Sequence, residues 1–219
     1  RERNAVESEY RLKLKDDNRR GQDVLQEQVN PQHPLSKFTV GNLDTLADFD
    51  GRPLRPELLA IYKKYYSANI MKLVVLGNQS LDELQAMVEP RFAPVANNKV
   101  VVDAPAAPLF APGQLPMQLS IVPLQNSRSL SLNFPLPKMF PLWQKKPANY
   151  LAALLGHEGE GSLLEALKTR GWAEGLSAGT GLEDRGGALF YVEISLTPAG
   201  LAYQAEIVEM FFATVEMIA

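Results

Sequence analysis

The chain of 219 residues has no cysteine, so it can form neither disulfide bonds nor thiolate metal sites. An excess of positive charge is also missing: 22 Lys and Arg stand against 25 Asp and Glu, and no nucleic-acid partner is expected. No apolar run approaches the roughly 18 residues that cross a membrane, so no membrane span is expected. Apolar residues still make up 46% of the chain, which is enough for a folded core.

Histidine is scarce as well, with only His33 and His157 in the whole sequence. Neither has a second histidine four residues away, so the chain lacks the His-x-x-Glu-His helix of an inverted zincin. His33 lies between prolines in a predicted loop, where a lone histidine is more often structural. His157 precedes Glu158, but glycines on both sides indicate a break between helices and argue against zinc binding there.

The first ten residues favour a helix and contain three carboxylates, Glu2, Glu7 and Glu9. On a helix of 3.6 residues per turn, Glu2 and Glu9 lie only about 20° out of line, so they share one face. Glu7 lies well off that face. A solvated, charged helix face is the ordinary interpretation of such a pair, and a functional pair is the alternative.

The first half of the chain alternates helical patterns with loops and contains one apolar run. Pro56 is expected at the first position of a helix, and Ser80 with Glu83 predicts a capping box. The expected elements are one long helix over residues 1–28, a loop over 33–52, a helix over 56–66, a buried strand over 70–76 and a capped helix ending at Phe92.

Five prolines interrupt residues 93–116, which predicts an interdomain linker in which 100–102 is the only strand-like piece. The pattern then restarts, and Thr197 with Pro198 at the first helical position predicts the start of a final helix. The expected elements are strands over 117–122 and 129–134, helices over 147–155 and 162–170, and strands over 172–180 and 188–196. The sequence therefore predicts two α+β units.

Four stretches, in this order, resemble the insulinase/pitrilysin family of zinc peptidases, the inverted zincins. The resemblance covers nearly the whole chain. The stretches are Arg1–Glu9, Asn30–Phe38 followed by Gly41-Asn42, Tyr65–Met71, and Leu155–Gly159 followed by Gly161–Leu164.

The resemblance implies an α+β fold of two homologous insulinase-type units, each an antiparallel-rich sheet packed with helices, with the first unit truncated. Residues 1–104 would form the C-terminal part of the catalytic domain, and 105–219 a second, non-catalytic domain. Glu9 would be the third protein ligand of a zinc ion, and Glu2 a nearby acidic residue that supports catalysis. The chain is interpreted as an internal piece downstream of the missing histidines, so by itself it is expected to bind no zinc and to be inactive.

The resemblance also implies a substrate-binding strand, an exosite, to which a peptide adds by main-chain pairing. Its residues would be Leu176, Ser177, Ala178, Gly179 and Thr180. Ala178 replaces a glycine that is usual in the family, and Thr180 replaces a longer polar residue. Main-chain pairing should survive both changes. The alternative interpretation is an ordinary core strand.

The sequence is compatible with two functions. The first is part of a zinc metalloendopeptidase that cleaves peptides in a closed chamber, with the remaining domains of the same polypeptide as partners. The second is a non-catalytic binding or assembly paralogue of the same fold. The presence of both Glu2 and Glu9 on one helix face favours the first function, the zinc metalloendopeptidase. The lack of cysteine and the resemblance to bacterial members favour a Gram-negative periplasm, with the cytoplasm as the alternative.

Overall fold

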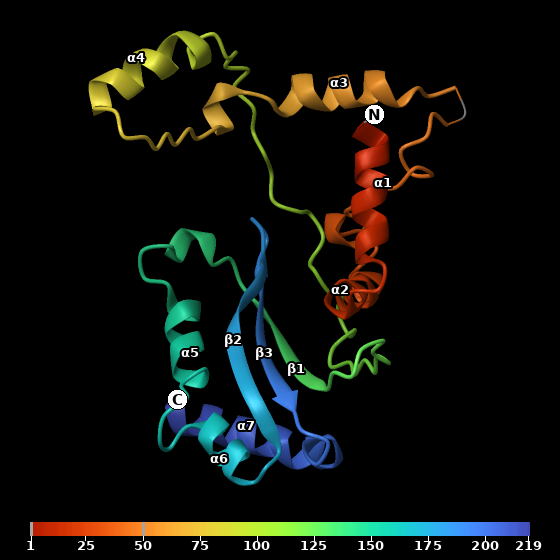
Figure 1. Cartoon of the computed structure of the whole chain (residues 1–219), viewed down its shortest axis with the longest axis vertical. Helices are drawn as coiled ribbons and strands as arrows, with labels where there is room; N and C mark the ends of the chain where they lie inside the picture. The colour runs from red at the N-terminus through yellow and green to blue at the C-terminus, as the bar shows by residue number, and fades with distance from the viewer. Residues whose placement is uncertain (1, 50) are drawn as a thin grey trace. The chain divides into compact units, whose positions relative to one another are not determined.

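The computed structural model describes every residue except 1 and 50, and it divides the chain into two compact units (Figure 1). The first unit comprises Arg1–Tyr10 with Val40–Asp103, and the second comprises Arg11–Thr39 with Ala104–Ala219. The assignment of residues 1–104 to a catalytic domain and of 105–219 to a second domain stays a prediction.

The predicted single helix over residues 1–28 is wrong, because the structure has two helices, α1 (Glu2–Lys13) and α2 (Asp17–Gln28). Asp16 lies between the two helices and has an extended backbone, with φ −82° and ψ 114°. Its carboxylate accepts a hydrogen bond from the Arg19 amide at 3.1 Å. Asp16 is thus the N-cap of α2. A capping residue inside a run of helix formers is enough to start a new helix.

The first unit contains α3 (Leu54–Tyr65), α4 (Leu81–Phe92) and the short 3₁₀ helix η2 (Ala68–Ile70). The capping box is confirmed: the Glu83 carboxylate accepts from the Ser80 amide at 2.8 Å, and the Ser80 hydroxyl accepts from the Glu83 amide at 3.4 Å. Pro56 is the third residue of α3 rather than the first.

The predicted buried strand over residues 70–76 is wrong, since this run forms no ladder with any described residue and stays exposed. The side chains of Val74 and Leu76 are 89% and 98% exposed. A strand exists only where a neighbouring strand accepts and donates its hydrogen bonds. Within the described part of the first unit, pairing is limited to an isolated bridge between Phe49 and Arg52.

Residues 100–102 and 117–122 also form no strand. In the first unit, the amide of Val100 donates to the side chain of Asn69 at 3.1 Å, and the Asn69 amide group donates back to the Val100 carbonyl at 2.8 Å. The backbone of Val100 is therefore satisfied by a side chain instead of a neighbouring strand.

The second unit is built on a three-stranded antiparallel sheet of β1 (Ser129–Leu136), β2 (Ala173–Glu183) and β3 (Ala188–Leu196). The spatial order is β1-β3-β2, so β3 is central (Figure 1). The helices α5 (Pro147–Leu155), α6 (Leu163–Thr169) and α7 (Gln204–Ile218) pack with one face of the sheet. This small antiparallel sheet with helices confirms a mixed α+β class, whereas the equivalence of the two units stays a prediction.

The core lies between the sheet and these helices, and it follows the two sequence periods. Alternate residues of β3 point toward the helices, and residues three or four apart on the helices meet them. The most deeply buried side chains are Leu164, Leu167, Val192, Ile194, Ile207 and Phe211. No helix among the described residues is long and apolar enough to span a membrane.

The start of the last helix differs from the prediction. The hydroxyl of Thr197 accepts from the Gly200 amide at 2.9 Å across the turn that precedes the 3₁₀ helix η4 (Gly200–Tyr203), and α7 begins only at Gln204. Pro198 lies in the turn before η4 rather than at the first position of an α-helix. Two further 3₁₀ helices are η1 (Pro34–Ser36) and η3 (Phe140–Leu142).

Asp17, the first residue of α2, ties this helix to the segment before β1. Its carboxylate accepts hydrogen bonds from the amides of Leu124 and Gln125 at 2.8–3.0 Å, and Arg20 approaches at 2.6 Å. The amide of Leu124, then that of Gln125 and the Arg20 guanidinium, lower the pKa of Asp17 below its ordinary value of 3.8. The charged carboxylate is the form that these donors stabilise.

We therefore expect Asp17 to make the stability of the second unit depend on pH. Because its folded-state pKa is lowered, its stabilising contribution is fully present above pH 3.8 and is lost as the pH falls below that value. Denaturation with urea at several pH values should show Asp17→Asn less stable than the parent near neutral pH, with the difference shrinking in acid. A difference that grew in acid would contradict this assignment.

Candidate functional site

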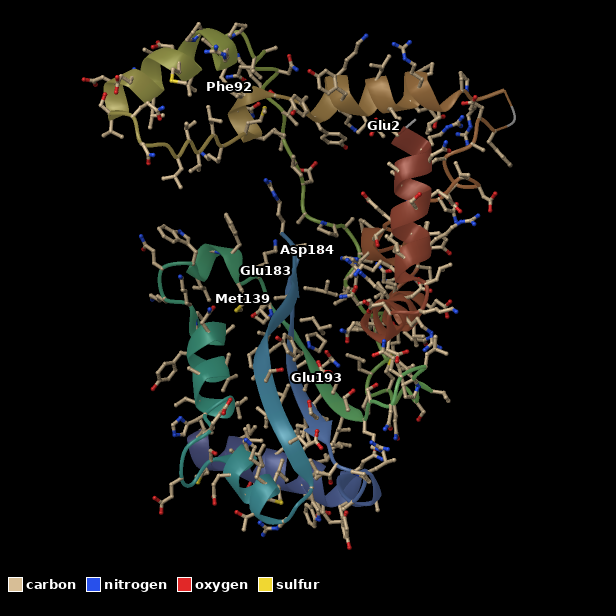
Figure 2. All side chains as sticks on the ribbon, in the orientation of Figure 1. Glu2, Phe92, Met139, Glu183, Asp184 and Glu193 are labelled. Carbon is tan, nitrogen blue, oxygen red and sulfur yellow. The ribbon has the colours of Figure 1, made fainter. Side chains whose placement is uncertain are left out.

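Glu2 (Figure 2) and Glu9 lie on α1 with exposed side chains, and the seven-residue spacing on this helix places them on one face as predicted. Among the described residues, neither carboxylate has a hydrogen-bond or ion-pair partner. Glu7 differs, because its carboxylate accepts from the Leu43 amide at 2.9 Å. Glu7 therefore holds a loop in place, and Glu2 and Glu9 remain available to a ligand.

A complete zinc site is not present in the described part of the chain, where no three metal-binding side chains lie together. A protein zinc site takes at least three ligands, and Glu9 can supply only one. The zinc role of Glu9 and the supporting role of Glu2 therefore stay predictions. The other ligands and the general base would have to come from another part of the polypeptide.

His33 has a structural role, as the sequence suggested. The ring is only 4% exposed, its Nδ1 accepts from the Leu35 amide at 3.2 Å, and its Nε2 lies 3.2 Å from a carboxylate oxygen of Asp184. Both ring nitrogens are therefore engaged, and with Nδ1 as an acceptor, Nε2 carries the proton that is donated to Asp184. Sequence reasoning missed this contact, since the two residues are far apart in the chain.

His157 lies exposed in the turn between α5 and α6, with Gly156 as the residue that ends α5. A Cβ built on Gly156 would lie 2.8 Å from the Ala152 carbonyl and 3.9 Å from the backbone nitrogen of Ala178. The end of α5 thus lies beside β2. The Gly156-His157 segment is a close-packed helix end next to a strand, and the expectation that His157 is not a zinc ligand stays a prediction.

β2 is an edge strand: β3 pairs with one side of it, and no described strand pairs with the other. Leu176 is buried in the core and Ala178 packs against it, while Ser177 is exposed on the opposite face with Gly179. Thr180 is half-buried. An edge strand has a row of backbone groups free to pair with another chain, so β2 has the position that peptide binding requires.

Comparison with known proteins places this geometry in context. A family model described as "Peptidase M16 inactive domain" matches residues 54–219. The A-factor-processing enzyme of Saccharomyces cerevisiae is 38% identical over 221 residues, which cover 100% of this chain and 22% of that protein. Insulin-degrading enzyme-like 1, peroxisomal, of Arabidopsis thaliana is 39% identical over 222 residues, with 100% and 23% covered.

A solved structure, that of pitrilysin, superposes with a TM-score of 0.89 at 30% sequence identity, covering 99% of this chain and 23% of that one. The chain therefore spans less than a quarter of each of these proteins. The expected Gram-negative periplasm is contradicted, because both curated relatives are eukaryotic proteins and one is named for the peroxisome.

Proposed function

Because the chain belongs to the M16 family of peptidases, the insulinase/pitrilysin family, we propose that it is part of a zinc-dependent metalloendopeptidase that cleaves peptides inside a closed chamber. The observation that carries the proposal is the pair of exposed carboxylates of Glu2 and Glu9 on one face of α1, neither of which has a partner in the part of the chain that the structure describes. Zinc in such enzymes acidifies a bound water and polarises the substrate carbonyl. In this proposal Glu9 is a zinc ligand and Glu2 supports it.

In the same proposal, residues 176–180 of β2 bind the substrate as an added strand. The free edge of β2 supports this role, because main-chain pairing supplies affinity without requiring a particular sequence. It also explains why Ala178 and Thr180 can depart from the family pattern, since neither change removes a backbone donor or acceptor. The peptide is expected to bind here with its scissile bond elsewhere in the chamber.

The second candidate is a non-catalytic binding or assembly paralogue. The observation in its favour is that the matching family model describes an inactive domain and covers residues 54–219, outside α1. The two candidates differ in their need for Glu9. A paralogue that binds no zinc has no chemical use for two free carboxylates on one helix face.

We expect the intact polypeptide that contains this chain to bind about one zinc ion and to cleave a quenched fluorogenic peptide. A chelator should stop the reaction and added zinc should restore it, whereas the 219-residue chain alone should show no turnover. Elemental analysis and a fluorescence assay measure the two properties. An intact protein that is folded, free of zinc and inactive would establish the non-catalytic paralogue instead.

A further inference from the structure

The face of the sheet that points away from the helices has an aromatic ring next to its free edge. Tyr191 of β3 is paired with Gly179 of β2. A Cβ built on Gly179 would lie 3.4 Å from Cε1 and Oη of Tyr191, and one built on Gly181 would lie 3.3 Å from Cδ1. The Tyr191 ring therefore lies across β2, in the space that side chains at these two positions would otherwise fill.

This arrangement extends the reach of Tyr191 toward a strand that adds to β2. Neighbouring strands lie about 4.8 Å apart, so the added strand would be about 10 Å from β3, too far for most direct side-chain contacts. Because the ring already covers the glycines of β2, it forms the surface that a side chain opposite Gly179 would meet. Tyr191 is only half-buried, so part of the ring is available for that contact.

Glu193 lies two residues farther along β3 on the same face, paired with Ser131 of β1 and Ser177 of β2 (Figure 2). It is half-buried, and its carboxylate has no hydrogen-bond or ion-pair partner among the residues described. Ser177 is small and exposed, so it leaves the carboxylate open toward the edge of β2. The face therefore combines an aromatic ring with a carboxyl group that no described residue pairs with.

We propose that Tyr191 and Glu193 determine which peptides add to β2. Side chains on one face of a strand are two residues apart, so one side chain of the added strand meets Tyr191 while the side chain two positions away points toward Glu193. The ring favours an apolar or aromatic side chain, and the carboxylate favours Lys or Arg. The selected peptide thus carries an aromatic-x-basic pair, or the reverse order if it runs in the other direction. This inference rests on the proposed role of β2 in substrate binding.

Direct binding to the intact polypeptide tests the proposal, measured by fluorescence anisotropy with chelator present so that no peptide is cleaved. All peptides are N-acetylated, which removes their terminal charge. A peptide with a Phe-x-Lys pair should bind about tenfold more tightly than its Phe-x-Glu or Ala-x-Lys counterpart. Glu193→Gln should remove the preference for Lys over Glu, and Glu193→Lys should reverse it. Tyr191→Ala should remove the preference for Phe over Ala.

Glu209→Gln is the matched control, because Glu209 is an exposed carboxylate on α7 and its replacement should leave both preferences unchanged.

A second experiment uses peptides methylated at single backbone nitrogens. If the peptide pairs with the edge of β2, methylation should weaken binding at every second position only, because alternate amides of the peptide point toward β2. If methylation weakens binding at alternate positions but the Tyr191 and Glu193 variants keep the parent's preferences, the specificity proposal is overturned and peptide binding at the edge of β2 is kept. Binding that is insensitive to methylation at every position would overturn edge binding itself.

Discussion

Replacement of Glu9 by Gln in the intact polypeptide is expected to lower kcat/KM for peptide hydrolysis by at least about a thousandfold and to remove the zinc. A change in the residues that merely surround a metal ligand already costs about 10–100-fold, so loss of a ligand should cost more. Gln keeps the size of the side chain, and Glu9 is exposed and contacts no partner among the described residues. The zinc-free variant should therefore unfold at the same temperature as the zinc-free parent, while its activity is lost.

Two variants make this result specific. Glu2→Gln should retain zinc and lose about 10–100-fold in kcat/KM, as a residue that supports the metal would. Glu89→Gln, an exposed glutamate near the end of α4, should change neither property. Full zinc content together with undiminished hydrolysis in Glu9→Gln would refute the assigned role of Glu9.

Gly200→Ala is expected to destabilise the second unit by about 3 kcal/mol or more, the range of strongly disruptive core substitutions. A Cβ on Gly200 would lie only 1.9 Å from the backbone carbonyl oxygen of Trp172, far inside the distance that atoms tolerate. That oxygen cannot move freely, because it accepts a hydrogen bond from the Thr197 amide at 3.0 Å. The Trp172 ring is also stacked on Tyr203 at 4.6 Å between centroids.

Gly21→Ala is the control for this substitution, since Gly21 belongs to the same unit and lies within α2. No atom lies within 4 Å of a Cβ built there. Alanine restricts the unfolded chain more than glycine does, so this variant should gain about 0.5–1 kcal/mol. Urea denaturation monitored by tryptophan fluorescence measures both changes. Equal stabilities for the two variants would show that the backbone at Gly200 can relax away from Trp172.

Local patterns predicted the elements from residue 129 onward well. The helix over residues 147–155 and the strand over 188–196 have the predicted limits, and the strand predicted over 129–134 extends only two residues further. Each of these elements has its own signal, such as the alternation of Leu130, Leu132 and Phe134 or the proline at the start of α5. The capping box at Ser80 succeeded for the same reason, because residues three apart carry the whole interaction.

The failures in the first half have a different cause. Residues 70–76 have the composition of a buried strand, but a strand is a relation between two segments, and no partner lies among the described residues. At Asp16, the helical pattern runs through a residue that can either continue a helix or cap the next one. The structure shows the second outcome. A local pattern cannot decide whether Asp16 continues one helix or caps the next, because both alternatives use the same residues.

By itself, the sequence determined the family, the α+β class, the shared face of Glu2 and Glu9 and most elements from residue 129 onward. Motifs and periodicity are properties of neighbouring residues, so they can be read without the fold. The family resemblance implied an edge position for the strand over residues 175–180, which the strand order shows. Only the tertiary structure decided that Tyr191 covers Gly179 and Gly181 and that His33 is bound to Asp184. These features join segments that are distant in the chain. Their energies depend on strand order and packing, which no local pattern specifies.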